Sequence, residues 1–135
     1  MIAIRLKQGA ALLLMCLLTA CMQPQPTPPP EAGRYLVFFD EFSANLTPQA
    51  RQVVADAARK AQEVGARAIR VEAHASATGS PAANQKLTET RAQVTYDELK
   101  KDGVNPATIQ QVSLGQTETG DASVADRRVD IVLLK

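Results

Sequence analysis

The stretch AIRVEAHASATGSPAANQKLTETRAQV, residues 68–94, contains the pattern of a strand, a sharp loop and a helix start, in that order. Residues 68–75 alternate between apolar and polar side chains, which predicts a half-buried strand. Ser80 followed by Pro81 is typical of a helix start, because the serine can cap free N–H groups and the proline needs no acceptor. We therefore expect a strand that leads through a short loop into a helix ending near Gly103.

The same signals recur on both sides of this stretch. Thr47-Pro48 predicts another helix start, and apolar residues at three- and four-residue spacing continue the helix to Gly65. Asn105-Pro106 predicts a short helical turn, and the remaining expected strands are 34–39, 111–115 and 127–134. The predicted order β-α-β-α-β-β gives an α/β chain, an α+β two-layer sandwich with a small mixed sheet, both helices on one face and the other face partly solvated.

The first twenty residues are predicted to be a signal peptide. Arg5 and Lys7 form a basic head, and the apolar run 10–18 that follows is too short to span a bilayer. The run ends in Leu18-Thr19-Ala20-Cys21, which resembles the lipobox of bacterial lipoproteins. This resemblance implies that Cys21 becomes the first mature residue and carries acyl chains such as palmitate, which would hold the protein on a bilayer.

Residues 21–33 are expected to tether a domain to that anchor. Five of the twelve residues in 22–33 are proline, a composition that favours an extended chain over a packed core. The sequence thus predicts three parts: a lipoprotein signal peptide (1–20), a lipidated and proline-rich tether (21–33) and one domain (34–135).

Composition argues against several functions. The chain after residue 20 has 13 basic and 14 acidic residues, so it lacks the positive field that nucleic-acid binding needs. It has one histidine, no cysteine beyond Cys21 and no glycine-rich phosphate loop. We therefore expect no enzyme, no cofactor, no metal site and no nucleic-acid partner.

Three motifs resemble the C-terminal, peptidoglycan-binding domain of the outer membrane protein A (OmpA) family, which includes the peptidoglycan-associated lipoprotein and the motor stator protein. VEAHASATGSPAANQKLTETRAQV carries the central motif, with a histidine, a glycine, an asparagine and a Leu-Thr-x-x-Arg-Ala run in register. FFDEFSANLTPQA resembles the opening motif and DRRVDI the closing one. The resemblance covers residues 35–134 and implies the fold described above.

In that family an aspartate and an arginine grip the free end of diaminopimelate in the peptide stem of the cell wall, the acid taking the ammonium and the arginine the carboxylate. The resemblance places Arg91 at the arginine position and Ser76 at the aspartate position, so the expected acid is missing. It also makes His74, Asn84 and Arg128 candidate ligand-binding residues. These residues also have structural alternatives: Arg91 could bridge surface acids, Asn84 could fix the loop, and His74 could be a solvated strand residue. One arginine of the pair Arg127 and Arg128 could instead pair with acids of the opening strand.

Two functions follow as expectations. The first is an outer-membrane lipoprotein whose periplasmic domain binds peptidoglycan with a site altered at Ser76. The second is a structural or interaction subunit of an envelope complex, partnered by other envelope proteins, that keeps the fold without binding peptidoglycan. The residue that separates the two is Ser76, because a hydroxyl group cannot replace the charge of a carboxylate.

Overall fold

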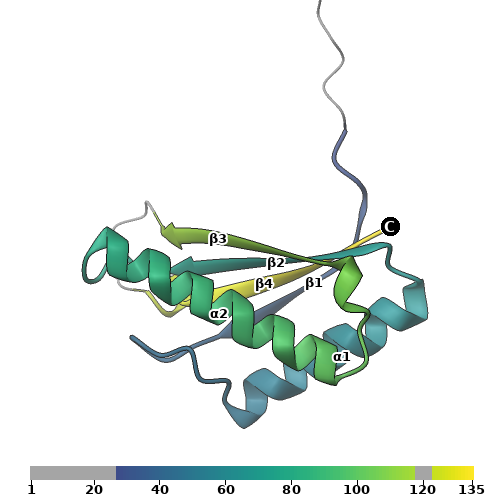
Figure 1. The fold of residues 1–135 in the computed structure, drawn as a ribbon, viewed down its shortest axis with the longest axis horizontal. Coiled ribbons are helices and arrows are strands. Elements are labelled where there is room, and N and C mark those ends of the chain that lie inside the picture. Colours follow the sequence, from purple (N-terminus) through teal and green to yellow (C-terminus); the bar gives the residue numbers. More distant parts are fainter. Residues whose placement is uncertain (1–26, 118–122) are drawn as a thin grey trace, which may run out of the picture.

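The computed structural model describes residues 27–117 and 123–135, where four strands form one mixed sheet with two helices on one face (Figure 1). The strand order is β1-β4-β2-β3. β4 lies between β1 and β2 and runs antiparallel to both, whereas β3 is parallel to β2. The strands are β1 (Glu31–Phe38), β2 (Ala68–Ala75), β3 (Ile109–Gln116) and β4 (Arg128–Leu134).

Both helices begin as the sequence predicts. Thr47 caps α1 (Pro48–Val64) by accepting a hydrogen bond from the N–H of Ala50, and Ser80 caps α2 (Pro81–Lys101) in the same way. Gly65 ends α1 in the left-handed conformation, at φ 62°. Two 3-10 turns complete the described elements, η1 (Pro106–Thr108) and η2 (Val124–Asp126).

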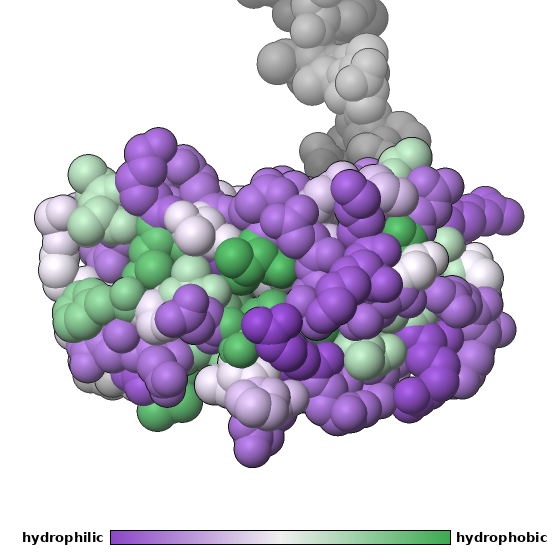
Figure 2. Space-filling model, turned by 60° about the horizontal axis from the view of Figure 1, so that its bottom comes forward, coloured by the Kyte–Doolittle hydropathy of each residue, from purple (hydrophilic) through white to green (hydrophobic). Residues whose placement is uncertain are grey.

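The core lies between the helices and one face of the sheet. It is built from small residues of α1, such as Ala57 and Ala61, against alternate residues of the strands, such as Val37, Val71 and Ile131. Seen from the helix side, the surface is mostly hydrophilic, with apolar side chains near its middle (Figure 2). No helix among the described residues is long and apolar enough to span a membrane.

The opposite face of the sheet is uncovered and carries a charged network. Arg34 of β1 reaches Asp130 of β4 at 2.8 Å and Glu72 of β2 at 3.5 Å, so ion pairs cross three neighbouring strands. Exposed apolar side chains, including Leu36 and Leu114, stand on the two outer strands of this face. The predicted partly solvated sheet face is confirmed.

Along the direction of its strands, the domain has two different ends. Because β1, β2 and β3 run in one direction, the segments that follow them (39–47, 76–80 and the one after 116) leave from the same end. Residues 27–30, which are exposed and have no regular structure, enter at the other end, beside the C-terminus (Figure 1). We call the first of these the loop end.

Ordered structure begins earlier than the sequence suggests. β1 starts at Glu31 rather than at residue 34, because Glu31 pairs with Leu134 of β4 and its carboxylate binds Arg34 at 2.7 Å. The N–H of Lys135 also donates to the carbonyl of Pro30. The first strand therefore starts three residues before the expected one.

Candidate functional site

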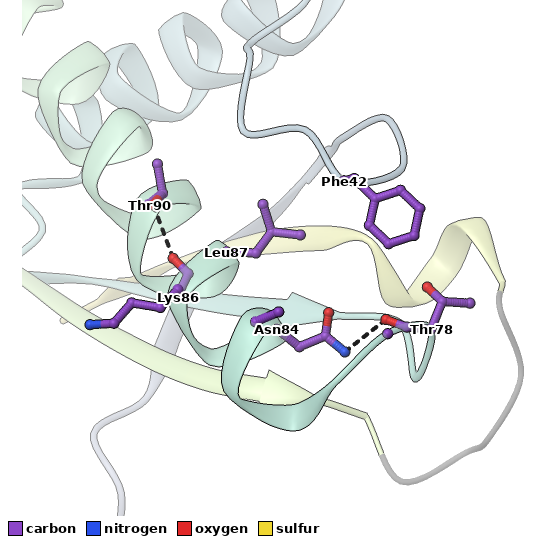
Figure 3. Close-up of a pocket in the computed structure, with 8 residues that line it drawn as sticks. Phe42, Thr78, Asn84, Lys86, Leu87 and Thr90 are labelled. Atoms are coloured by element: carbon purple, nitrogen blue, oxygen red, sulfur yellow. Dashed lines mark hydrogen bonds between the residues drawn. The ribbon is translucent and has the colours of Figure 1, made fainter.

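The loop between β2 and α2 is held by a buried amide. Asn84, in the first turn of α2, is 3% exposed. Its Nδ2 group donates to the carbonyls of Ser76 at 3.1 Å and Thr78 at 3.0 Å, and it lies 3.3 Å from Oε1 of Gln116 on β3 (Figure 3). Asn84 thus positions the loop, which was the structural alternative for this residue.

Ser76 occupies the position where the family's motif has its aspartate, and the structure gives it a neutral partner. Its side chain is almost fully buried, and its Oγ atom lies 2.9 Å from Oγ1 of Thr78. The two hydroxyl groups bond to each other and supply no charge. The loop therefore offers hydroxyl and amide chemistry only.

Arg91 lies in the middle of α2, and its side chain is fully buried. Its Nε donates to the carbonyl of Ser43 at 2.8 Å, Nη1 to that of His74 at 3.1 Å and Nη2 to that of Asp40 at 3.0 Å. The alternative of a surface ion pair is therefore wrong for this residue: backbone carbonyls take the place of acids. Arg91 joins the end of β1, the following segment and the end of β2.

The charge of Arg91 has no acidic counterpart in the described part of the chain, where no ion pair involves its guanidinium. Burial, and to a lesser extent the positive charge of nearby Arg127, lower the pKa of Arg91 to about 10. The side chain stays protonated at neutral pH. Among the described residues, backbone carbonyls rather than a carboxylate therefore surround this buried charge.

A groove of about 320 Å³ opens at the loop end (Figure 3). It lies between the segment after β1, the β2–α2 loop and the first turns of α2. The only charged residue in its wall is Lys86, which pairs with Glu89 at 3.0 Å. The complete wall consists of Phe42, Thr78, Gly79, Ala83, Asn84, Lys86, Leu87 and Thr90.

Phe42 forms one side of the groove and has an unusual conformation. Its φ angle of 54° is in the left-handed region, which a phenylalanine rarely adopts, and its side chain points toward the groove (Figure 3). Together with Ala83 and Leu87 it makes that wall largely apolar. Sequence reasoning missed Phe42, Leu87 and Thr90 as wall residues, because no periodicity distinguishes an apolar side chain beside a groove from one in the core.

His74 and Arg128 do not belong to this groove. Their side chains lie on the uncovered sheet face, where Arg128 donates to Asp130 at 2.8 Å. His74 contributes only its backbone carbonyl to Arg91. The five candidate residues are thus split between two faces, because alternate residues of a strand point to opposite sides.

The ring of His74 sits in a charged cluster on that face. Burial lowers the pKa of His74, and the charge of Arg128 lowers it further; its Nε2 atom is buried without a hydrogen-bond partner. Possible ligand atoms of Glu72, His74 and Asp130 all lie within 4.8 Å of one another. A cation there would have to compete with arginines, because Arg34, Arg70 and Arg128 already bind these two carboxylates.

Comparison with known proteins identifies the family. The model of the OmpA family matches residues 38–129, which include the groove and Arg91. The chain belongs to the OmpA family. Among curated OmpA relatives, outer membrane protein A of Bordetella avium is 27% identical over 122 residues, and an outer membrane protein of Gluconacetobacter diazotrophicus is 36% identical over 121 residues. These alignments cover 83% and 80% of this chain but 63% and 31% of the relatives, so the chain spans only part of their length.

Solved structures of the family share the fold. An OmpA-like domain from Francisella tularensis superimposes with a TM-score of 0.65 at 22% identity, covering 76% of this chain and 73% of that one. The peptidoglycan-associated lipoprotein of Burkholderia pseudomallei gives 0.64 at 24% identity, with 75% and 90% coverage. The periplasmic domain of Helicobacter pylori MotB gives 0.61 at 22% identity, with 73% and 71% coverage. The predicted OmpA-like fold is confirmed.

Proposed function

We propose that this chain is a lipid-anchored envelope protein whose OmpA-family domain binds the peptide stem of peptidoglycan without covalent chemistry. The observation that carries the proposal is the position of the groove. It opens at the loop end, opposite the end where residues 27–30 enter. A protein held through its N-terminus would therefore present the groove away from the membrane. One of its structural relatives is named a peptidoglycan-associated lipoprotein, which supports the same function.

In this proposal Arg91 attracts the stem through its charge. The guanidinium is buried and bonded to three carbonyls, and no carboxylate among the described residues forms an ion pair with it, so its positive charge favours a carboxylate in the groove. Thr78 contributes a hydroxyl group to the groove, the buried hydroxyl group of Ser76 bonds to it from behind, and Asn84 holds the loop in place. His74 and Arg128, whose side chains lie on the other face, take no part in ligand binding.

The anchor is the second part of the proposal. Cys21 lies outside the described residues, and its lipidation is inferred from the Leu-Thr-Ala-Cys motif alone. The residue after it is Met22 rather than an acid, which is compatible with export to the outer membrane. With the domain in the periplasm, the proline-rich segment would set the distance between membrane and wall, and no catalytic step is needed.

One observation favours the alternative function, an envelope interaction module without peptidoglycan binding. The carbonyl bonds of Arg91 give this residue a structural role that is independent of any ligand. An arginine at this position is therefore compatible with a domain that has lost its ligand along with the acid at residue 76.

Sedimentation of the full chain, purified in detergent, with insoluble peptidoglycan tests the proposal. We expect the wild-type chain to co-sediment and Leu87→Asp, which places a like charge against a stem carboxylate, to lose most of that binding. Leu114→Asp is the matched control, because Leu114 is 49% exposed on the uncovered sheet face. Absence of co-sedimentation by the folded wild-type chain would support the interaction module instead.

A further inference from the structure

Asn84 uses only one side of its amide group to hold the loop between β2 and α2. Its Nδ2 atom donates to the carbonyls of Ser76 and Thr78, and the side-chain oxygen of Gln116 lies 3.3 Å from the same atom. All three of these neighbours are oxygen atoms that accept hydrogen bonds and cannot donate them. The nitrogen of the amide must therefore face the loop, and Oδ1 must face the other way.

The oxygen of Asn84 points into the groove. Asn84 is 3% exposed and belongs to the groove wall, and its oxygen points toward the space between Leu87 and Phe42 (Figure 3). Within the part of the chain that the structure describes, no donor bonds to this Oδ1 atom. The atom keeps contact with solvent, since the buried side-chain atoms without a partner are Nε2 of His74 and Oδ2 of Asp102. The groove thus contains a fixed acceptor that lacks a donor.

The rest of the wall is mostly apolar. Phe42, Ala83 and Leu87 contribute apolar surface, and of the described wall residues Lys86 alone is charged. Charged residues of both signs stand elsewhere at the loop end, namely the acids Asp40, Glu41 and Asp126 and the bases Arg91 and Arg127. None of these five lines the groove. Because their charges partly cancel, the chemistry of the wall itself decides which group fits.

A ligand for this wall needs an N–H donor between apolar groups. A peptide backbone meets this need, because each residue other than proline carries one N–H group beside its side chain. An N-acetylated sugar also has an amide N–H, but its hydroxyl groups would lie against apolar side chains and lose hydrogen bonds to water. The volume of about 320 Å³ is at the small end for a ligand pocket and suits a segment of a few residues.

We propose that the groove binds a peptide through a backbone amide whose N–H donates to Oδ1 of Asn84, with a small aliphatic side chain against Phe42 and Leu87. This inference rests on the proposed function of the site and specifies the chemistry of its ligand. Asn84 then has two roles, since its nitrogen orders the loop and its oxygen receives the ligand. An acceptor that is already fixed loses little conformational freedom on binding, which favours affinity.

Nuclear magnetic resonance titration of the full chain in detergent, labelled with ¹³C and ¹⁵N at asparagine, tests the inference. The probe is trialanine blocked at both ends, and its analogues each replace one alanine N–H by an ester oxygen. We expect one analogue to bind about tenfold more weakly than the peptide, the effect of roughly one hydrogen bond, and the others to bind with similar affinity. The side-chain carbonyl signal of Asn84 should shift with the peptide and return toward its free value with the sensitive analogue.

Two substitutions verify where the peptide binds. Leu87→Asp should abolish binding, because it places a solvated charge in the apolar wall. Leu114→Asp is the matched control on the uncovered sheet face and should leave the affinity unchanged. Circular dichroism verifies that both variants remain folded. Peptide binding that a folded Leu87→Asp chain retains in full would overturn the inference.

The possible results separate the inference from the function on which it rests. Equal affinity for the peptide and every analogue, or a signal of Asn84 that does not move, would overturn the amide contact and leave peptidoglycan binding in place. A shift of that signal by N-acetylglucosamine and not by the peptide would also overturn the inference, because the acceptor would then serve a sugar amide. A chain that co-sediments with peptidoglycan but does not bind the peptide would overturn the inference alone. If a folded wild-type chain bound neither, the proposed function and the inference would both be wrong.

Discussion

The guanidinium of Arg91 lies over the ring of Phe39, with its central carbon 5.1 Å from the ring centroid. This contact places a helix residue beside Phe39, which directly follows β1. The carbonyl bonds of Arg91 hold the segment after β1, through Asp40 and Ser43, and the end of β2, through His74. A cation over an aromatic face is stabilised by the ring quadrupole, which partly compensates for the missing carboxylate. Arg91 therefore stabilises the backbone at the loop end and also places a positive charge there.

The first prediction concerns this support. Arg91→Met should lower the free energy of unfolding by about 3 kcal/mol, because three buried carbonyls lose their donor. Arg59→Met is the control: that side chain is 64% exposed, and its change should cost less than about 0.5 kcal/mol. Urea denaturation followed by circular dichroism measures both. Equal stability of the two variants would contradict the structural role of the three carbonyl bonds of Arg91.

The second prediction concerns the missing acid. Ser76→Asp should increase the affinity for a stem with a free diaminopimelate amine by roughly 1.5 to 3 kcal/mol, the value of one charged hydrogen bond. Ser76→Asn, which adds no charge, should leave it unchanged. Calorimetric titration of each variant with this stem at low and high salt measures the affinities, and the gain in the aspartate variant should decrease as the salt concentration rises. An equal gain in the asparagine variant would show that size rather than charge limits binding.

A third prediction follows from His74. Burial and the charge of Arg128 lower its pKa in the folded state below the ordinary value of about 6.5. The unfolded chain therefore binds the proton first as the pH falls through 6.5, and stability decreases there. His74→Gln should remove this part of the pH dependence. Urea midpoints at pH 7.5 and 5.5 test it: the wild type should lose more stability between them than the variant.

The fourth prediction tests the anchor. Cys21→Ser should leave the protein unprocessed or release it from the membrane fraction, because no thiol would remain to carry lipid at the cleavage site. Cys16→Ser, within the predicted signal peptide, is the control and should still reach the membrane. Mass spectrometry of the mature N-terminus provides the measurement. A wild-type protein free in the periplasm with an unmodified N-terminus would contradict the lipoprotein assignment.

The fifth prediction tests where the domain begins. Limited proteolysis should cut between Met22 and Pro30 but not within β1, because Glu31 is already paired with β4. Deleting residues 22–28 should change the melting temperature by no more than about 2 °C, since exposed tether residues contribute little to stability. A larger decrease would show that the tether packs on the domain.

Local signals predicted most of the secondary structure. The alternation of residues 68–75 gave β2 with its observed bounds, and the capping residues Thr47 and Ser80 gave both helix starts. The sequence did not reveal that β4 inserts between β1 and β2, because strand order depends on contacts between distant segments. It also placed the first strand too late, since Glu31 and Arg34 look like surface residues until their pairing is seen.

The site was harder to predict than the fold. The buried face of α2 includes the polar residues Asn84, Thr88 and Arg91. Hydrophobic periodicity cannot detect a buried face made of polar residues, because their burial depends on partners elsewhere in the chain. Of the residues that the family motif singled out, Ser76, Asn84 and Arg91 lie at the loop end, whereas the alternation of β2 directs the side chain of His74 to the uncovered sheet face.

The antiparallel pairing of β1 with β4 also determines how the domain bears mechanical load. In the proposed lipid-anchored protein, the N-terminal end of β1 would face the membrane, and the groove lies beyond the C-terminal end of that strand. A pull between membrane and wall would then act along β1. Seven residue pairs join β1 to β4, and a force in this direction shears them together instead of opening them one after another. In the proposed anchored protein, the arrangement that points the groove away from the anchor would thus load β1 in shear, which resists force better than opening the residue pairs one by one.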